Sequence, residues 1–333
     1  KRIYLMAMVI PFVSMIGVGL AWWLNRRQKQ RLVQQGFSPE QAWQMVDVRD
    51  AESEPTKPNW WILGGSMAFV LFTLTVGLGG FPYREEIVFG GSMTIVLFLM
   101  SRLMRELEPD KRLTLVGTAA VVFSLRAIPG SGPGATWWMI DDLKFDQQFL
   151  SVLSLIGGIV ALAGMFVFRR FMAERSIAYV VGFLTIVGTI LAVPVAGMYY
   201  GLHEWTARVT GGIVDARFIA LVDTALESPL VQISMIPMLA WIANSAPTNL
   251  KATFFAVMAS FTNLALSLGQ LGTKYLNEIF VITRAVRDQA TGTIQTPADY
   301  SQLGELLIVQ LLLGVLIPFS AILFAKLTKF KSL

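Results

Sequence analysis

The sequence contains no cysteine and a single histidine, His203. The absence of cysteine excludes disulfide bonds and thiolate-ligated zinc or iron–sulfur sites. His203 falls in a connection between apolar runs, where we expect a solvated side chain rather than a metal ligand or a proton relay. We therefore predict no metal site and no cofactor.

Motifs for nucleotide hydrolysis and for hydrolytic catalysis are also absent. The sequence has no G-x-x-x-x-G-K-[ST] phosphate loop, no H-E-x-x-H motif and no G-x-S-x-G motif. The glycine-rich residues 129–134, PGSGPG, lack the lysine and hydroxyl residue that a phosphate loop requires. These absences exclude an ATP-driven pump and favour a protein that is not an enzyme.

Charged residues are scarce, at 15% of 333 residues against 54% hydrophobic residues, and the mean hydropathy is +0.59. The net charge of +5 is spread over several connections, so we expect no nucleic-acid partner. Apolar runs long enough to cross a hydrocarbon core of roughly 30 Å recur along the chain and predict an all-α, polytopic membrane helix bundle surrounded by lipid. The runs, about nine in number, are residues 3–24, 60–80, 86–104, 112–131, 148–169, 176–200, 214–242, 250–275 and 303–326.

Lysine and arginine concentrate in alternate connections between these runs. The basic connections are residues 25–31, 102–112, 169–175 and 326–331. By the positive-inside rule they lie in the cytoplasm, which predicts a multi-pass protein of the inner or plasma membrane with a cytoplasmic C-terminus. An odd number of runs then places the first residue outside, so we expect a further N-terminal segment of the same protein, absent from this sequence.

Two carboxylates occur well inside the run 214–242. Asp223 and Glu227 are four residues apart and so share a helix face. Pro229 and Pro237 are expected to interrupt this helix, as in the broken helices around transport sites, and Gln232 adds a polar group on another face. Ionisable groups at membrane depth are candidates for solute binding or proton coupling. Alternatively, Asp223 is solvated near the interface, or pairs with an arginine such as Arg217 or Arg126.

Further polar and aromatic candidates flank the proline-rich segment after residue 126. Arg126 is expected near the outer mouth, where it attracts an anionic solute or extends to the interface. Trp137 and Trp138 fit either an interfacial aromatic belt or a stacking surface for a flat ring. In the run 250–275, Ser260 and Asn263 are polar: small residues allow close helix packing, whereas an amide that is buried needs hydrogen-bond partners.

Several blocks together resemble the folate–biopterin transporter family of the major facilitator superfamily. Residues 127–172 match without gaps the family's segment in which a proline, here Pro129, ends the seventh helix and an aromatic cluster follows. Blocks 223–237, 241–247 and 251–263 resemble the family's tenth and eleventh helices. The resemblance covers roughly residues 110–328 and assigns family positions to Asp223, Gln232, Pro237, Pro247, Thr253, Ser260 and Asn263.

Three positions depart from the family's usual residues. Lys251 stands where glutamate is usual, Arg126 where glutamine is usual, and Gly132 where an acidic residue is common. The resemblance implies that residues 106–333 form a C-terminal six-helix bundle. Residues 1–105 then hold a remnant of the N-terminal bundle and a cytoplasmic linker at 25–58. An inserted helix pair would give about fourteen spans in total. The alternative is a total of about twelve spans, with residues 3–24 as the fourth helix.

The resemblance implies a secondary active transporter that moves a small, anionic, aromatic solute, similar to folate or pterin, by alternating access, with proton coupling as in a symporter. Asp223 is then the coupling group. The alternative is a non-transporting assembly or accessory subunit of a larger membrane complex, built on the same major facilitator scaffold.

Overall fold

The structure is a computed structural model that describes residues 9–39, 41, 59–105, 107–245, 251–287 and 294–328. Within these residues the regular secondary structure is helical apart from one two-stranded antiparallel sheet. The elements are α2 (Val9–Gln34), α4 (Trp60–Leu78), α5 (Arg84–Met104), α6 (Pro109–Arg126), α7 (Pro133–Asp141), α8 (Gln147–Val167), α9 (Arg169–Glu174), α10 (Ile177–Tyr199), α11 (Leu202–Val209), α12 (Ala216–Ser245), α13 (Lys251–Ile279), β1 (Val286–Arg287), β2 (Ile294–Thr296) and α14 (Leu303–Leu327).

The chain divides into two compact units, Lys1–Lys57 and Pro58–Leu333. In the first unit, residues 9–24 of the predicted run belong to α2, which continues past the apolar residues to Gln34. After α2, the backbone N–H of Ser38 donates to Gln41 Oε1 at 3.1 Å and that of Gln41 donates to Ser38 Oγ at 3.2 Å. These reciprocal bonds form a capping box, a common start of a helix.

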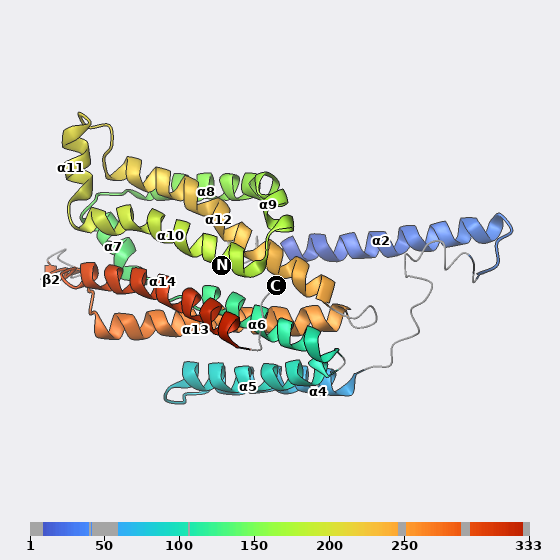
Figure 1. Cartoon of the computed structure of the whole chain (residues 1–333). Coiled ribbons are helices and arrows are strands. Elements are labelled where there is room, and N and C mark those ends of the chain that lie inside the picture. Colours follow the sequence, from blue (N-terminus) through green and yellow to red (C-terminus); the bar gives the residue numbers. More distant parts are fainter. Residues whose placement is uncertain are drawn as a thin grey trace. The chain divides into compact units, whose positions relative to one another are not determined.

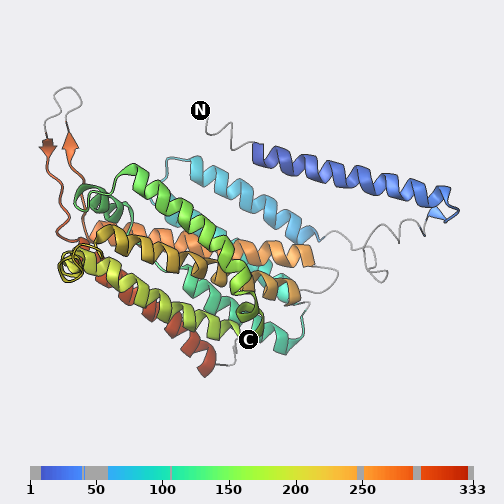
Figure 2. The same ribbon diagram turned by 90° about the horizontal axis from the view of Figure 1, so that it is seen from above.

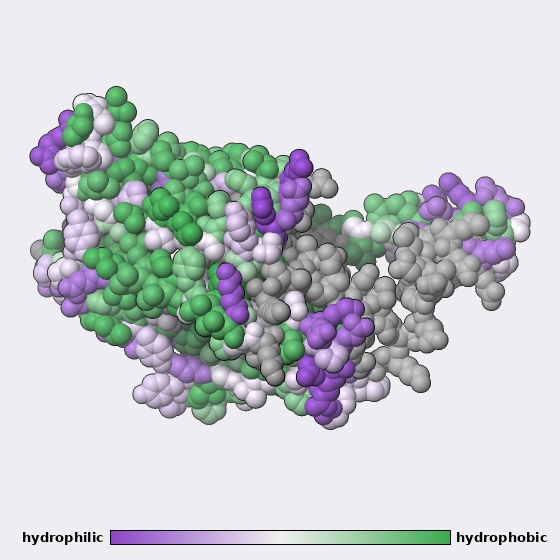
Figure 3. Space-filling model, in the orientation of Figure 1, coloured by the Kyte–Doolittle hydropathy of each residue, from purple (hydrophilic) through white to green (hydrophobic). Residues whose placement is uncertain are grey.

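The prediction of an all-α, multi-pass membrane protein is confirmed. Each of the nine apolar runs falls on a helix. Of the helices searched in the described part, six are long and apolar enough to cross a membrane: α4, α5, α8, α10, α13 and α14. Figure 3 shows hydrophobic residues over most of the face formed by α10 and α14, with hydrophilic residues gathered toward the helix ends. This distribution suits a bundle surrounded by lipid.

The second unit is a bundle in which helices distant in sequence lie side by side (Figures 1 and 2). α12 packs against α8 and α10, α10 packs against α14, and α6 packs against α13 and α14. The short helix α11, which contains His203, lies across the long helices at one end (Figure 1). The histidine predicted to lie in a loop is therefore helical.

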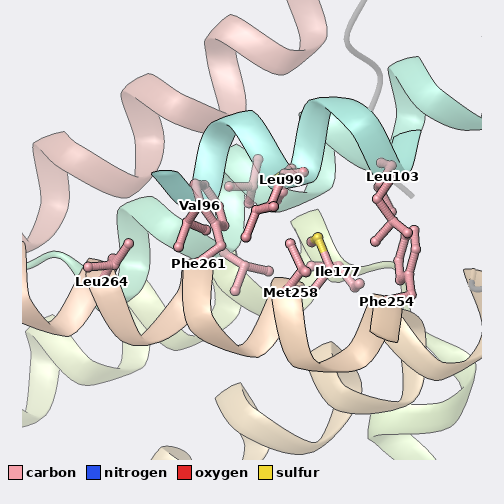
Figure 4. Packing of buried hydrophobic residues seen from close by; sticks show 14 of the residues in the cluster. Val96, Leu99, Leu103, Ile177, Phe254, Met258, Phe261 and Leu264 are labelled. Atoms are coloured by element: carbon pink, nitrogen blue, oxygen red, sulfur yellow. The ribbon is translucent and has the colours of Figure 1, made fainter. Parts of the chain in front are cut away.

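The helix pair α4–α5 packs as part of the second unit, through α5 and α13. Val96, Leu99 and Leu103 of α5 meet Phe254 and Phe261 of α13 in a buried cluster (Figure 4). At the other end of this contact, an ion-pair network joins the two helices. Lys274 Nζ forms ion pairs with Glu86 Oε1 at 2.8 Å and with Glu85 Oε2 at 3.3 Å. The Tyr275 hydroxyl donates a hydrogen bond to Glu86 Oε1 at 2.8 Å.

The predicted seventh helix is broken into α6 and α7 by residues 127–132. The apolar run 112–131 extends past the end of α6 at Arg126, and α7, which starts with Pro133 at its N-terminus, was not predicted. Gly132 has a φ of +76°, a left-handed conformation that glycine tolerates best. The non-helical backbone therefore begins before Pro129, and a second short helix follows it.

Helix α13 accepts this broken segment through two glycines and two polar side chains. A Cβ at Gly272 would lie 2.8 Å from Pro129 Cγ, and one at Gly269 would lie 3.0 Å from the Ile128 carbonyl oxygen. The N–H of Gly130 donates to Thr273 Oγ1 at 2.8 Å. Asn277 Nδ2 donates to the Ser131 carbonyl at 3.3 Å. The contact thus satisfies backbone groups that a broken helix leaves free.

The prediction that prolines interrupt the helix carrying Asp223 is wrong. α12 runs without a break from Ala216 to Ser245, through Pro229 and Pro237. Pro229 is buried and packs on α8, where a Cβ at Gly164 would lie 2.6 Å from Pro229 Cβ. Packing against neighbouring helices lets a membrane helix continue through proline despite the missing N–H.

The segment between α13 and α14 is an anchored ribbon. Thr283 and Asp299 exchange backbone hydrogen bonds of 3.0 and 2.9 Å, and β1 pairs with β2 beyond them. Arg284 binds both carboxylate oxygens of Asp141 in α7, at 3.2 and 3.0 Å, and the Tyr300 hydroxyl donates to Asp141 Oδ2 at 2.5 Å. We call Asp141, Arg284 and Tyr300 the outer latch. It fixes the ribbon to the end of α7.

The outer latch shifts the titration of its members. Hydrogen bonds from Arg284 and Tyr300 lower the pKa of Asp141 below its ordinary value. Burial, with the hydrogen bond to Asp141, raises the pKa of Tyr300 to about 12. Stability from ionised Asp141 is complete above about pH 4 and is lost as pH falls through its lowered pKa. Stability from the neutral phenol is complete below about pH 10 and is lost as pH rises toward the raised value.

Replacing Gly272 with alanine is expected to destabilise the bundle by about 1–3 kcal/mol, because the new methyl group overlaps Pro129. Thermal unfolding of the purified protein in detergent, followed by circular dichroism, measures this change. Gly158→Ala in α8 is the matched control, since a Cβ there meets nothing within 4 Å. Equal unfolding midpoints for the two variants would contradict the proposed contact.

Replacing Asp141 with asparagine is expected to remove up to about 1 kcal/mol of local stability at pH 7, because the carboxylate is 29% exposed and partly screened. Hydrogen exchange at the Thr283 and Asp299 amides should become several-fold faster. The difference from the unmodified protein should shrink only as pH falls through the lowered pKa of Asp141, where the native carboxyl itself becomes protonated. Asp142→Asn is the control, and an equal effect there would argue against the latch.

Candidate functional site

A cavity of about 440 Å³ lies inside the bundle of the second unit. Its walls come from α6, α7, α10, α12 and α14, together with the broken segment between α6 and α7. The volume falls within the ~300–1,000 Å³ of ordinary small-molecule sites. We call it the main cavity. It holds the carboxylates that sequence analysis singled out.

Asp223 and Glu227 both line the main cavity. Their spacing of one helical turn on α12 places both side chains on the same wall. Neither carboxylate forms a hydrogen bond or an ion pair with another described residue. Arg217, considered above as a partner for Asp223, instead binds Asp146 Oδ2 at 3.0 Å. The two carboxylates thus face the cavity without a fixed counter-ion among the described residues.

Uncharged polar groups face the carboxylates from other elements. Thr185 and Thr189 of α10, Gln310 of α14 and Ser131 of the broken segment also line the main cavity. None of these four residues was predicted from the sequence. Their signal in the sequence is weak, because uncharged polar residues are common in membrane helices and turns, and only the fold brings these segments together.

The candidates near the broken helix separate into two groups. Trp138 is 5% exposed, lines the main cavity and packs against Tyr199 at a ring-centroid distance of 5.7 Å. Trp137 is half-buried and is not among the lining residues. Arg126 is also half-buried and outside the lining, and its Nε is buried without a hydrogen-bond partner among the described residues. The structure therefore brings Trp138, but neither Trp137 nor Arg126, to the cavity wall.

A second cavity of about 290 Å³ lies between α10, α11 and α12. Asp223 lines this cavity as well as the main cavity. The other described lining residues are apolar apart from Thr206, whose hydroxyl donates to the Val214 carbonyl at 2.7 Å. The Asp223 carboxylate is thus the polar group common to both spaces.

Ser260 and Asn263 lie on α13, away from the main cavity. Ser260 is half-buried and its hydroxyl donates to the Ala256 carbonyl at 2.9 Å. Asn263 is exposed, although its amide was considered above as a buried group. With Ser267 and Gln270 these residues repeat at intervals of three and four and form one face of α13, which we call the polar stripe.

The remaining predicted positions are structural or lie beyond the described part. Pro129 is buried against Gly272, and Thr253 is half-buried near the start of α13. Pro247 lies outside the described residues. The backbone of Gln232 and Pro237 belongs to α12, but their side chains lie outside the described part. The groups of three or more metal-ligating side chains that a metal ion needs do not occur among the described residues.

The chain matches one family model and is similar to two transporters of known name. A model of the BT1 family matches residues 87–330. Over 167 residues the chain is 23% identical to the "Folate-biopterin transporter" of Synechocystis sp. (strain ATCC 27184 / PCC 6803 / Kazusa), covering 49% of this chain and 33% of that protein. It is 25% identical over 167 residues to the "Putative folate transporter 2" of Plasmodium berghei (strain Anka), covering 48% of this chain and 34% of that protein.

The chain spans about a third of the length of these two relatives. No solved structure matches it. The family match starts within α5 and includes α6 to α14, so it contains the main cavity, the polar stripe and the outer latch. Since the match covers well over half of the chain, the protein belongs to the BT1 family of folate–biopterin transporters, which is a family of transporters and not of enzymes.

Proposed function

We propose that this chain forms the C-terminal part of a secondary active transporter for a flat heteroaromatic solute of the pterin or folate type. The single observation that carries the proposal is the pair Asp223 and Glu227, which face a cavity inside a membrane bundle without partners among the described residues. Ionisable groups at membrane depth are costly and occur mainly where they bind or couple. The names of the two relatives supply the class of solute.

Proton coupling is the role that we assign to Asp223. Two carboxylates one helical turn apart in a medium of low dielectric constant repel each other, so one of them favours its protonated form. Asp223 lines the second cavity as well as the main cavity. A proton could therefore reach its carboxyl from either cavity, on either side of the contact between α10 and α12. A carboxyl that can be reached from two sides is suited to take up a proton on one side and release it on the other.

Alternating access needs a second bundle opposite residues 106–333. The polar stripe on α13 supports this arrangement, because an amide such as Asn263 is costly when it faces lipid and is better placed against water or another helix. The C-terminal bundle would rock against its N-terminal counterpart around a site near the middle of the membrane. Basic residues at the ends of α5, α9 and α14 support a cytoplasmic C-terminus.

Replacing Asp223 with asparagine in the complete natural protein is expected to abolish uptake driven by a pH gradient, because the amide cannot carry the proton. Uptake of labelled folate and pterin into proteoliposomes, with and without the gradient, measures this. Glu305→Gln, an exposed carboxylate of α14 outside both cavities, is the matched control and should transport normally. Unchanged uptake by the Asp223 variant would refute the coupling role.

Absence of flux in the unmodified protein, with tight co-purification in a larger complex, would support the accessory-subunit alternative.

Replacing Asn263 with cysteine is expected to create a thiol that reacts with a membrane-impermeant maleimide, because the polar stripe faces a water-filled path. The sequence contains no cysteine, so the labelled site is unambiguous within this chain. Leu312→Cys is the control, since Leu312 is 55% exposed on the apolar surface of α14 and should meet lipid. Equal labelling of the two thiols in intact membranes would argue against a water-filled path along α13.

A further inference from the structure

We propose that the main cavity binds the edge of a heteroaromatic ring that carries two adjacent N–H donors, and that it excludes the anionic tail of a folate-like solute. This inference rests on the proposed function and specifies which part of the solute the site recognises. The 2-amino-4-oxopyrimidine half of a pterin has such an edge, formed by its exocyclic amine and the neighbouring ring N–H.

The negative charge of the main cavity wall favours a ring edge that donates hydrogen bonds. Among the described lining residues, Asp223 and Glu227 are the charged ones, and both are acidic. Arg126, the cation that suggested an anionic solute, is not among the described residues that line the cavity. A carboxylate tail placed here would meet at least one like charge, with no counter-ion among the described lining residues, in a medium of low dielectric constant. An uncharged or protonated ring avoids this repulsion.

The threonine hydroxyl groups of α10 add hydrogen-bond acceptors to those of the two carboxylates in the main cavity. The Thr185 hydroxyl donates to the Val181 carbonyl at 2.8 Å, and the Thr189 hydroxyl donates to the Thr185 carbonyl at 2.6 Å. Their protons are thus directed into the helix, and their oxygen lone pairs remain available as acceptors. The two carboxylates lie on α12, which packs against α10, so this part of the cavity wall favours a solute that donates hydrogen bonds.

The geometry of a carboxylate fits two parallel donors. A carboxylate accepts a bidentate pair of N–H groups from a planar, guanidine-like unit, and such pairs are stronger than single neutral hydrogen bonds. The remaining walls suit a flat ring, because Trp138 contributes an aromatic surface and Gly188 and Gly314 leave room for close approach. The two requirements, a planar body and a donor edge, are met by one end of a pterin.

A pair of pteridines that differ at one position tests the proposal. Binding of 2-amino-4-oxopteridine and of 2,4-dioxopteridine to the complete natural protein, measured by calorimetry in detergent, compares a donor with an acceptor at ring position 2. We expect the amino compound to bind at least about tenfold more tightly, because a site built to accept a hydrogen bond discriminates strongly against an analogue that lacks the donor. Folate should bind no more tightly than the amino compound.

Separate variants identify the carboxylates responsible. Glu227→Gln and Asp223→Asn are each expected to reduce affinity for the amino compound, and at least one should bring the ratio of the two affinities to within about threefold. Glu305→Gln should preserve the ratio. Unfolding midpoints of all variants show whether each remains folded, and the ligand comparison in the unmodified protein does not depend on them.

The outcomes separate this inference from the proposed function. Equal binding of the two pteridines, or a preference for the dioxo compound, would overturn the inference even if folate uptake persists. Tighter binding of folate than of the amino compound would also overturn it, because the tail would then contribute favourable contacts. Selective binding of the amino compound without any flux would support the recognition and contradict transport.

Discussion

The contact between the broken segment 127–132 and α13 determines the shape of the bundle core. Inside a membrane, each backbone N–H and C=O must find a partner within the protein, so a helix can end there only where a neighbour supplies hydrogen bonds. Thr273 and Asn277 supply them, while Gly269 and Gly272 let the two backbones approach closely. As a result, the chain can restart as α7 at a different position, and Trp138 reaches the cavity wall.

The outer latch holds α7, the short helix that follows the broken segment, at the end of the bundle. α7 is too short to be stable by itself, since isolated helices below roughly 12 residues are marginal. Its own contacts hold it in place, because Trp138 packs against Tyr199 and Asp141 binds Arg284 and Tyr300. The Tyr199 hydroxyl in turn donates to the Tyr300 carbonyl at 2.9 Å. Side chains from α10 and from the ribbon thus fix α7, and the ribbon depends on α7 for its own anchor.

The sequence predicts most of the helices and part of the site, and the reasons differ by element. Long apolar runs identify membrane helices because length and hydrophobicity suffice. The carboxylates at 223 and 227 are recognisable because charge is costly in those runs. The continuity of α12 through Pro229 was not predictable, since it depends on packing against Gly164 of α8. Thr185 and Gln310 were missed because they become neighbours of Asp223 only after folding.

The polar stripe and the cavity carboxylates lie in two separate places, and their separation bears on the proposed mechanism. The polar stripe is on α13, whereas the carboxylates face inward from α12 among α7, α10 and α14. A solute that moved along the stripe alone would not touch Asp223. The coupling role proposed for Asp223 therefore requires either that the solute enters the main cavity or that α12 transmits a change in protonation to the face of the bundle. The continuous α12 favours the first route, because an unbroken helix of 30 residues lacks the unwound hinge that would let one half move independently of the other.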